Sequence, residues 1–163
     1  MITPIVNEPA LVSRDRIKVL SVADVHLGIE WELRMGGISI PSQADAHKRR
    51  LRELIKKERP DAIVLLGDVK HNVPYTSRQE WREVPEFLGA LGELADVHIV
   101  PGNHDGDLER LIGGVHNVSM HPMGGFVLDG VGYVHGHAWP SAELYSAGCI
   151  VMSHNHPAVR FTD

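Results

Sequence analysis

The sequence AIVLLGD at residues 62–68 places five consecutive apolar residues directly before a glycine and an aspartate. A short apolar run of this kind is typical of a strand that is buried on both faces of a parallel sheet. Two further runs have the same form, IKVLSV at residues 17–22 and VHIV at residues 97–100. The polar side chains that follow the three runs are Asp24, Asp68 and Asn103. We therefore predict three buried strands whose carboxyl ends carry candidate site residues.

Helical patterns separate these strands. Residues 44–59 have an apolar stripe and a charged face, and Pro60 ends the segment. Residues 80–95 form a second predicted helix, with Pro85 near its first turn or at a kink. A short helix is expected at residues 107–112. The alternation of strands and helices predicts an α/β protein with a parallel sheet.

The pattern changes in the last third of the chain. Two apolar runs at residues 125–128 and 131–134 flank Asp-Gly, a strong signal for a β-hairpin turn. A short helix at residues 141–146 and a strand at 149–152 follow. We expect these elements to form a second sheet that packs on the first, with helices outside. Residues 1–16 are expected to be partly extended and residues 29–43 to be irregular.

Composition excludes several classes of protein. The chain has 163 residues, a formal net charge of -5 and one cysteine, Cys149. A single cysteine rules out an internal disulfide framework and fits a reducing compartment. We see neither a signal peptide nor an apolar run of the roughly 18–20 residues that a membrane span requires. The sequence therefore predicts a cytoplasmic protein without membrane contact.

Carboxylate, amide and imidazole groups follow the predicted strands in numbers that suit two divalent metal ions. Asp24 and His26 are two positions apart, so an extended segment places both on one face. The groups are Asp24, His26, Asp68, Asn103, His104, Asp105, His135, His137, His154 and His156. Taken alone, Asp24 and Asp68 could simply close turns. Together the set suits manganese, iron or zinc better than calcium, and it points to metal-assisted hydrolysis of a phosphate ester.

The order D-x-H, G-D, G-N-H-D, H and H-x-H resembles that of the calcineurin-like metallophosphoesterases. Three stretches look most like the archaeal phosphoesterases related to the SbcD nuclease subunit. They are ADVHLG at residues 23–28, GGISIP at 36–41 and GDVKH at 67–71. The resemblance implies a four-layer α-β-β-α sandwich of two mixed sheets with flanking helices.

The resemblance also implies roles for the site residues. One ion would be held by Asp24, His26 and His156. The second would be held by Asn103, His135 and His154, with Asp68 bridging the two. A hydroxide between the ions would attack phosphorus, and His104 would act as the general acid. Manganese is the expected metal, with iron, zinc, nickel and cobalt as alternatives.

Two departures from the family pattern stand out. Many relatives have an aspartate or asparagine shortly after G-D, where this chain has Lys70-His71-Asn72. Four residues are candidates for supporting or substrate-binding roles, namely His71, Asp105, His137 and Arg34. Relatives also usually continue past the last histidine pair. We expect one metallophosphoesterase domain over residues 1–163, either shortened at its C-terminal end or a compact variant whose open sheet edge pairs with a partner or a second copy.

The leading hypothesis is a phosphodiesterase that acts on a phosphate-ester substrate, for which nucleotides and nucleic acids are candidates. The first alternative is a nuclease that acts on DNA or RNA with a partner protein. The second is a non-catalytic scaffold on the same fold, which the complete ligand set disfavours. The cations of residues 44–59 resemble a nucleic-acid face, but interleaved acids favour an ordinary solvated helix surface.

Overall fold

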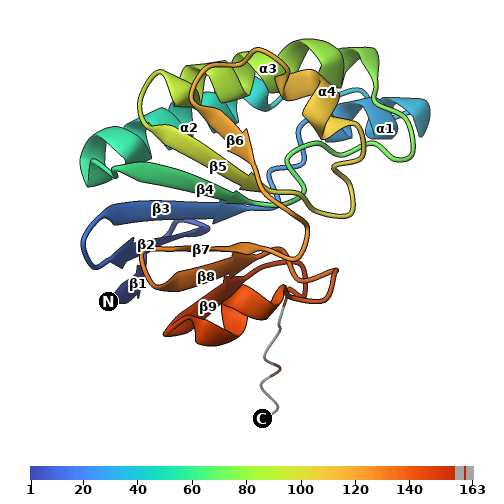
Figure 1. Ribbon diagram of the computed structural model, residues 1–163. Helices are drawn as coiled ribbons and strands as arrows, with labels where there is room; N and C mark the ends of the chain where they lie inside the picture. Colours follow the sequence, from blue (N-terminus) through green and yellow to red (C-terminus); the bar gives the residue numbers. More distant parts are fainter. Residues whose placement is uncertain (157–159, 161–163) are drawn as a thin grey trace.

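The computed structural model describes residues 1–156 and Arg160, which form two packed sheets with helices on the outer side of the larger one (Figure 1). The larger sheet has six strands in the order β1-β2-β3-β4-β5-β6. Its strands are β1 (Ile2–Pro4), β2 (Ala10–Arg14), β3 (Lys18–Ala23), β4 (Ala62–Leu66), β5 (Asp96–Val100) and β6 (Val118–Met120). Strands β3 to β6 pair in parallel, whereas β1 and β2 add an antiparallel edge. The three predicted parallel strands are confirmed.

The smaller sheet has the order β7-β8-β9. Its strands are β7 (Phe126–Leu128), β8 (Val131–Val134) and β9 (Cys149–Met152). The predicted hairpin joins β7 to β8, and Leu128 pairs with Val131 across the Asp-Gly turn. Strand β9 returns parallel to β8, so the second sheet is also mixed, as expected.

Helices cover the two outer faces unequally (Figure 1). On the larger sheet lie α2 (Ala44–Glu58), α3 (Arg78–Gly92) and α4 (Leu108–Ile112), and α1 (Ile29–Met35) lies beside them. Among residues 1–156 and Arg160, the smaller sheet is flanked only by η1 (Ala142–Ser146), a 3-10 helix. The α/β class with two mixed sheets and flanking helices is confirmed, and its outermost layer is reduced to this one turn.

Strand β4 shows why a strand that is covered on both faces needs apolar residues at every position. Ile63 and Leu65 pack against the helices, whereas Val64 and Leu66 face the smaller sheet. Successive side chains of a strand point to opposite faces, so a strand between two layers must be apolar throughout. All five residues of β4 are buried.

Helices α1 and α3 differ from the predictions made from sequence. Residues 29–35 of the stretch expected to be irregular form α1. Helix α3 begins at residue 78, two positions earlier than predicted, because Ser77 and Glu80 form a capping box at its N-terminus. Pro85 therefore lies inside the helix and not in its first turn. Within the described part of the chain, no helix has the length and apolar character that crossing a membrane would need.

The packing of the helix layer on the larger sheet should contribute to stability through Phe87, which is 1% exposed in α3. Replacing Phe87 by alanine should lower the free energy of unfolding by roughly 3–5 kcal/mol, because it removes a large buried side chain and leaves a cavity. Trp81 of the same helix is 44% exposed and provides the control. Trp81→Ala should lower the free energy of unfolding by about 1 kcal/mol or less. Equal losses for the two variants in urea denaturation would contradict this packing.

Candidate metal centre

Backbone hydrogen bonds tie together the loops that follow β3, β4 and β5. The Asp24 N–H donates to the Gly67 carbonyl at 3.1 Å, and the His26 N–H donates to the Asp68 carbonyl at 2.8 Å. The His104 N–H donates to Asp68 Oδ1 at 2.9 Å. The three loops therefore meet at one end of the parallel sheet, where open α/β sheets place their sites.

Asp68 lies at the centre of this meeting point and is 4% exposed. Its Oδ2 lies 3.8 Å from His26 Nε2 and 3.4 Å from His135 Nε2. Two sets of potential ligand atoms, each within 4.8 Å of one another, share this carboxylate. We call Asp24, His26 and Asp68 the first ligand group and Asp68, His135 and His154 the second. A carboxylate common to both groups is the arrangement that a bridging ligand requires.

The charge state of Asp68 is set by competing effects. Burial alone would raise the pKa of the carboxyl group, because desolvation disfavours the charged form. Hydrogen bonds from the His135 ring and from the His104 backbone N–H outweigh burial and lower the pKa to about 2. Asp68 is therefore ionised at neutral pH.

The fully buried ring of His135 is held in one orientation. Its Nδ1 lies 2.8 Å from the Leu66 carbonyl oxygen and 2.9 Å from Ser153 Oγ. Its Nε2 lies 3.3 Å from Asn103 Oδ1. Burial lowers the pKa of this imidazole, but its contacts with Asp68 and the Leu66 carbonyl raise it above the ordinary value. Binding of one ring nitrogen by a backbone carbonyl leaves the other nitrogen to serve as a ligand.

The last histidine pair reaches the same place from the loop after β9. The His154 ring centre lies 5.0 Å from that of His135. His156 is exposed, and its Nε2 lies 3.7 Å from Asp24 Oδ2. Five residues of the two groups and this loop have positive φ angles, namely Asp24, His26, Asp68, His154 and His156. Such conformations are uncommon for residues other than glycine and concentrate at functional sites.

The ring of His104 lies at the edge of the cluster. Its Nδ1 contacts the His71 carbonyl oxygen, which leaves Nε2 for other contacts. The His104 ring centre is 4.9 Å from that of His26 and 5.3 Å from that of His71. His104 is therefore close enough to the first ligand group to act on the same substrate.

The other predicted supporting residues occupy different positions. Asp105 is buried, which raises the pKa of its carboxyl group, and accepts hydrogen bonds from the Gly102 N–H at 2.8 Å and the Lys70 N–H at 3.1 Å. It thereby ties the loops after β4 and β5 together. The His137 ring centre lies 5.2 Å from that of His135. Arg34 is exposed on α1 and makes no side-chain hydrogen bond or ion pair to the other described residues.

Sequence patterns did not indicate three residues that support the cluster. Ser153 contacts His135, Glu32 contacts His71, and Glu80 accepts a hydrogen bond from the His71 N–H. Ser153 precedes the predicted ligand His154, which is the one available signal. Glu32 and Glu80 lie outside the metal-ligand motifs, and their contacts with His71 are recognised only from the fold.

The residues present fit a divalent cation. Asp24 Oδ1 is buried and has no hydrogen-bond partner among residues 1–156 and Arg160. A buried carboxylate oxygen without a partner is costly in a protein interior, and a cation would satisfy it. The mixture of carboxylate, amide and imidazole groups around it suits a transition metal.

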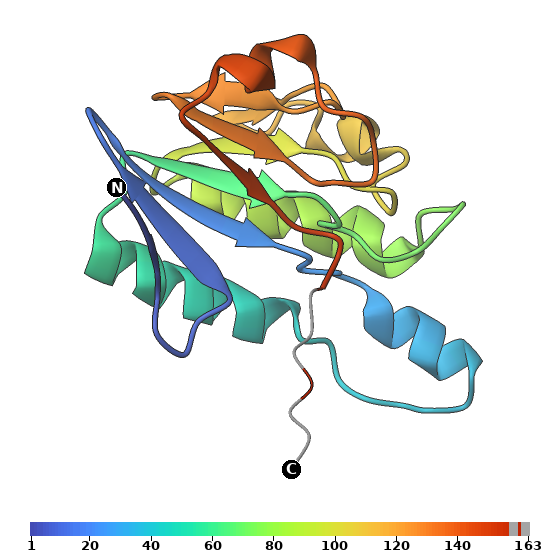
Figure 2. The ribbon, with the colours of Figure 1, turned by 90° about the horizontal axis from the view of Figure 1, so that it is seen from below.

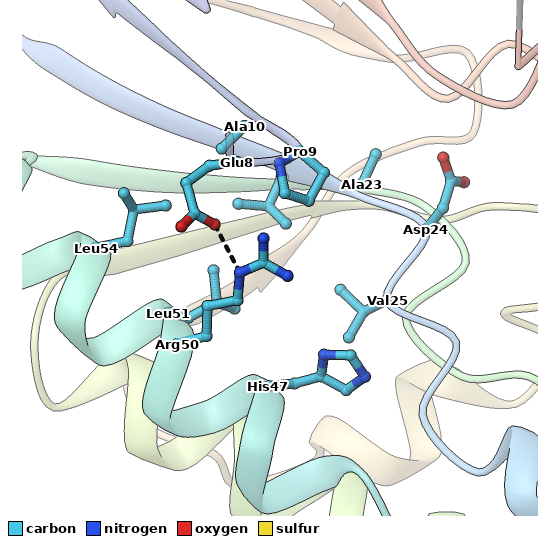
Figure 3. A pocket seen from close by; sticks show the side chains of 11 residues that line it. Glu8, Pro9, Ala10, Ala23, Asp24, Val25, His47, Arg50, Leu51 and Leu54 are labelled. Atoms are coloured by element: carbon cyan, nitrogen blue, oxygen red, sulfur yellow. Dashed lines mark hydrogen bonds and ion pairs between the residues drawn. The ribbon is translucent and has the colours of Figure 1, made fainter. Parts of the chain in front are cut away.

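The cluster opens onto two hollows. A groove of about 710 Å³ runs between β1–β3 and β9 and reaches Asp24, His154 and His156. On the other side of Asp24, a cavity of about 100 Å³ lies between β3 and α2 (Figure 3). Arg50 Nε lies 2.6 Å from Glu8 Oε2 at this cavity. A dashed line marks this ion pair in Figure 3. The groove is the larger approach to the ligand groups.

Comparisons with known proteins agree with this fold. The family model described as calcineurin-like phosphoesterase matches residues 17–160. The chain also resembles the solved structure entitled "Crystal structure of Pseudomonas putida nuclease MPE". The two are 20% identical with a TM-score of 0.51, and the match covers 85% of this chain and 68% of the other. This likeness supports the fold alone. No curated protein sequence matches the chain at a significant level.

Gly102 should be irreplaceable for steric reasons. A Cβ atom there would lie 2.2 Å from Asp68 Oδ1 and 2.5 Å from the Asp68 backbone nitrogen. Gly102→Ala should lower the free energy of unfolding by roughly 1–3 kcal/mol and weaken Mn²⁺ binding, because Asp68 must shift. Gly106→Ala is the control, since its Cβ would meet nothing within 4 Å. Unchanged calorimetric Mn²⁺ affinity in Gly102→Ala would contradict the close packing around Asp68.

The low pKa of Asp68 predicts a dependence of stability on pH. Folding favours the ionised carboxyl group, so its stabilising contribution is present above about pH 4 and is lost as the pH falls through about 2. The metal-free protein should therefore be more stable than Asp68→Asn at about pH 5, and the difference should narrow as the solution is acidified. Urea denaturation at several pH values measures this difference. A constant difference would show that the pKa is not depressed.

Proposed function

Because the chain belongs to the calcineurin-like phosphoesterase family, we propose that it is a phosphodiesterase with a dinuclear metal centre. The family establishes the coarser statement, that this is a metal-dependent hydrolase of phosphate esters. The observation that carries the proposal of a dinuclear centre is the sharing of Asp68 by the two ligand groups. Two cations on one carboxylate can together hold a singly esterified or doubly esterified phosphate.

The proposed ligands divide between the two ions. Asp24, His26 and His156 would hold one ion, Asn103, His135 and His154 the other, and Asp68 would contact both. Manganese is the proposed metal. Bound divalent ions would supply Lewis acidity and lower the pKa of coordinated water to about 7, which provides a nucleophile at neutral pH.

The protein's own contribution to bond cleavage is assigned to His104. Its Nδ1 is held by the His71 carbonyl oxygen, so Nε2 is the nitrogen available to the substrate. A proton on Nε2 would pass to the ester oxygen that leaves phosphorus, which prevents an unstable alkoxide from forming. The backbone N–H of His104 donates to Asp68, so the same residue that delivers the proton also fixes the central carboxylate.

Charge pairing on α2 favours a small phosphodiester over a long nucleic acid. Lys48 pairs with Asp45 and Glu86, and Arg50 pairs with Glu8. These cations are therefore partly neutralised. A nucleic acid would have to be held by other contacts, such as those offered by the groove that reaches Asp24. The nuclease likeness makes single-stranded DNA a necessary second substrate in the test.

The test compares substrates with good and poor leaving groups. Wild-type protein with Mn²⁺ should cleave bis-p-nitrophenyl phosphate and a thymidine dinucleotide, and should cleave p-nitrophenyl phosphate more slowly. His104→Ala should reduce kcat for the dinucleotide by about 10²–10⁴. The loss on the p-nitrophenyl diester should be smaller, because its phenolate leaves without protonation.

His116→Ala is the matched control, because His116 is exposed and lies outside the cluster. It should leave both rates unchanged. An equal reduction of kcat on both diesters in His104→Ala would contradict the general-acid role of His104. Absence of Mn²⁺-dependent cleavage of any of these esters or of single-stranded DNA, by protein that binds Mn²⁺, would favour the scaffold alternative.

A further inference from the structure

The ring of His71 connects a proposed metal ligand to an acidic side chain on α1. His71 Nδ1 lies 3.2 Å from His26 Nδ1, and His71 Nε2 lies 2.5 Å from Glu32 Oε2. The His71 side chain is 13% exposed, whereas that of Glu32 is 69% exposed. Figure 2 shows α1 continuing beyond the carboxyl end of β3. Glu32 lies on this helix.

The donors and acceptors of the Glu32–His71–His26 network can be arranged in only one way that leaves His26 Nε2 able to bind a metal. An ionised carboxylate only accepts hydrogen bonds, so His71 Nε2 must carry a proton. In neutral His71 the other nitrogen, Nδ1, then accepts from His26 Nδ1–H. His26 Nε2, which lies 3.8 Å from Asp68 Oδ2, keeps its lone pair.

We propose that Glu32 is a positioning residue that acts through His71 to fix the ring orientation and the tautomer of His26. The role of His26 as a metal ligand rests on the proposed function, whereas the Glu32–His71–His26 chain rests on distances alone. Partners of this kind, one step behind a ligand, typically affect metal affinity by about 10–100-fold. The chain gives α1 a part in the centre that no sequence motif indicates.

The backbone of His71 is held independently of Glu32. Glu80 is fully buried at the N-terminus of α3, and its Oε1 accepts hydrogen bonds from the His71 N–H at 2.9 Å and the Asn72 N–H at 2.7 Å. Removing the Glu32 carboxylate should therefore loosen the rings without displacing the loop. The fold of Glu32→Ala should be intact.

His26 and His71, together with His104, could instead be taken as a third metal site, because their ligand atoms lie within 4.8 Å of one another. The contacts disfavour that arrangement. His104 Nδ1 faces a carbonyl oxygen, His71 Nε2 faces Glu32, and the remaining nitrogens of His26 and His71 are at hydrogen-bonding distance from each other. The observed contacts instead fit the hydrogen-bonded network from Glu32 through His71 to His26, which we call the relay.

Calorimetric titration with Mn²⁺ alone tests the proposal without any substrate. His71→Ala should weaken binding at one of the two sites by about 10–100-fold, and Glu32→Ala by about tenfold. Glu32→Gln should restore most of the affinity, because an amide oxygen still accepts from His71. The double variant Glu32→Ala/His71→Ala should bind no more weakly than His71→Ala, since residues in one network are not additive. Glu53→Gln, an exposed residue of α2, provides the charge-matched control for Glu32→Gln.

Nitrogen-15 NMR of the metal-free protein gives an independent reading. His26 should be the Nδ1–H tautomer in wild type and a mixture of tautomers in Glu32→Ala. Additive losses in the double variant, an unchanged tautomer in Glu32→Ala, or three Mn²⁺ ions per chain would overturn the relay. Failure of wild-type protein to bind Mn²⁺ would instead count against the proposed function, and the tautomer measurement would still decide whether the relay exists.

Discussion

The buried carboxylate of Asp68 is the constraint on which the rest of the centre depends. Placing an ionised carboxylate in a protein interior is costly unless it is fully hydrogen-bonded or paired. Here the His104 backbone N–H and the His135 ring supply those partners, and Gly102 leaves the space that the carboxylate occupies. The loops after β4 and β5 must therefore meet in one arrangement for Asp68 to be buried at all. An arrangement of the loops that supplies hydrogen-bond partners to the Asp68 carboxylate also brings most of the proposed ligands close to it.

The predictability of the fold follows from how each element is stabilised. Strands such as β4 were predicted to the residue because burial on both faces requires apolar side chains throughout. Strand β6 was missed because its three residues alternate between partly buried and exposed positions. Helix α1 was missed because its seven residues, IEWELRM, lie between glycines and carry only a short apolar pattern. Its position depends on contacts with distant segments, such as that of Glu30 with Gln79.

The same distinction applies to the site. Residues that follow strands could be located from sequence, because the fold brings all carboxyl ends of parallel strands to one edge. Glu32, Glu80 and Ser153 could not, because each acts through a contact that only the folded chain forms. The departure at Lys70-His71-Asn72 was visible in the sequence, but its meaning depends on what His71 touches. The closer relation to archaeal SbcD-related phosphoesterases stays a prediction.

The strained backbone conformations of the two ligand groups are held in place to different degrees. Asp24, His26 and Asp68 adopt positive φ angles between β3, β4 and the helix layer, where hydrogen bonds between loops hold them. His154 also has a positive φ angle, but it lies on a loop that leaves the edge strand β9. Conformations of this kind cost of order 1–3 kcal/mol each and persist only where surrounding structure enforces them. The first ligand group is therefore prearranged by the fold, whereas the histidines after β9 depend more on what binds between them and Asp24.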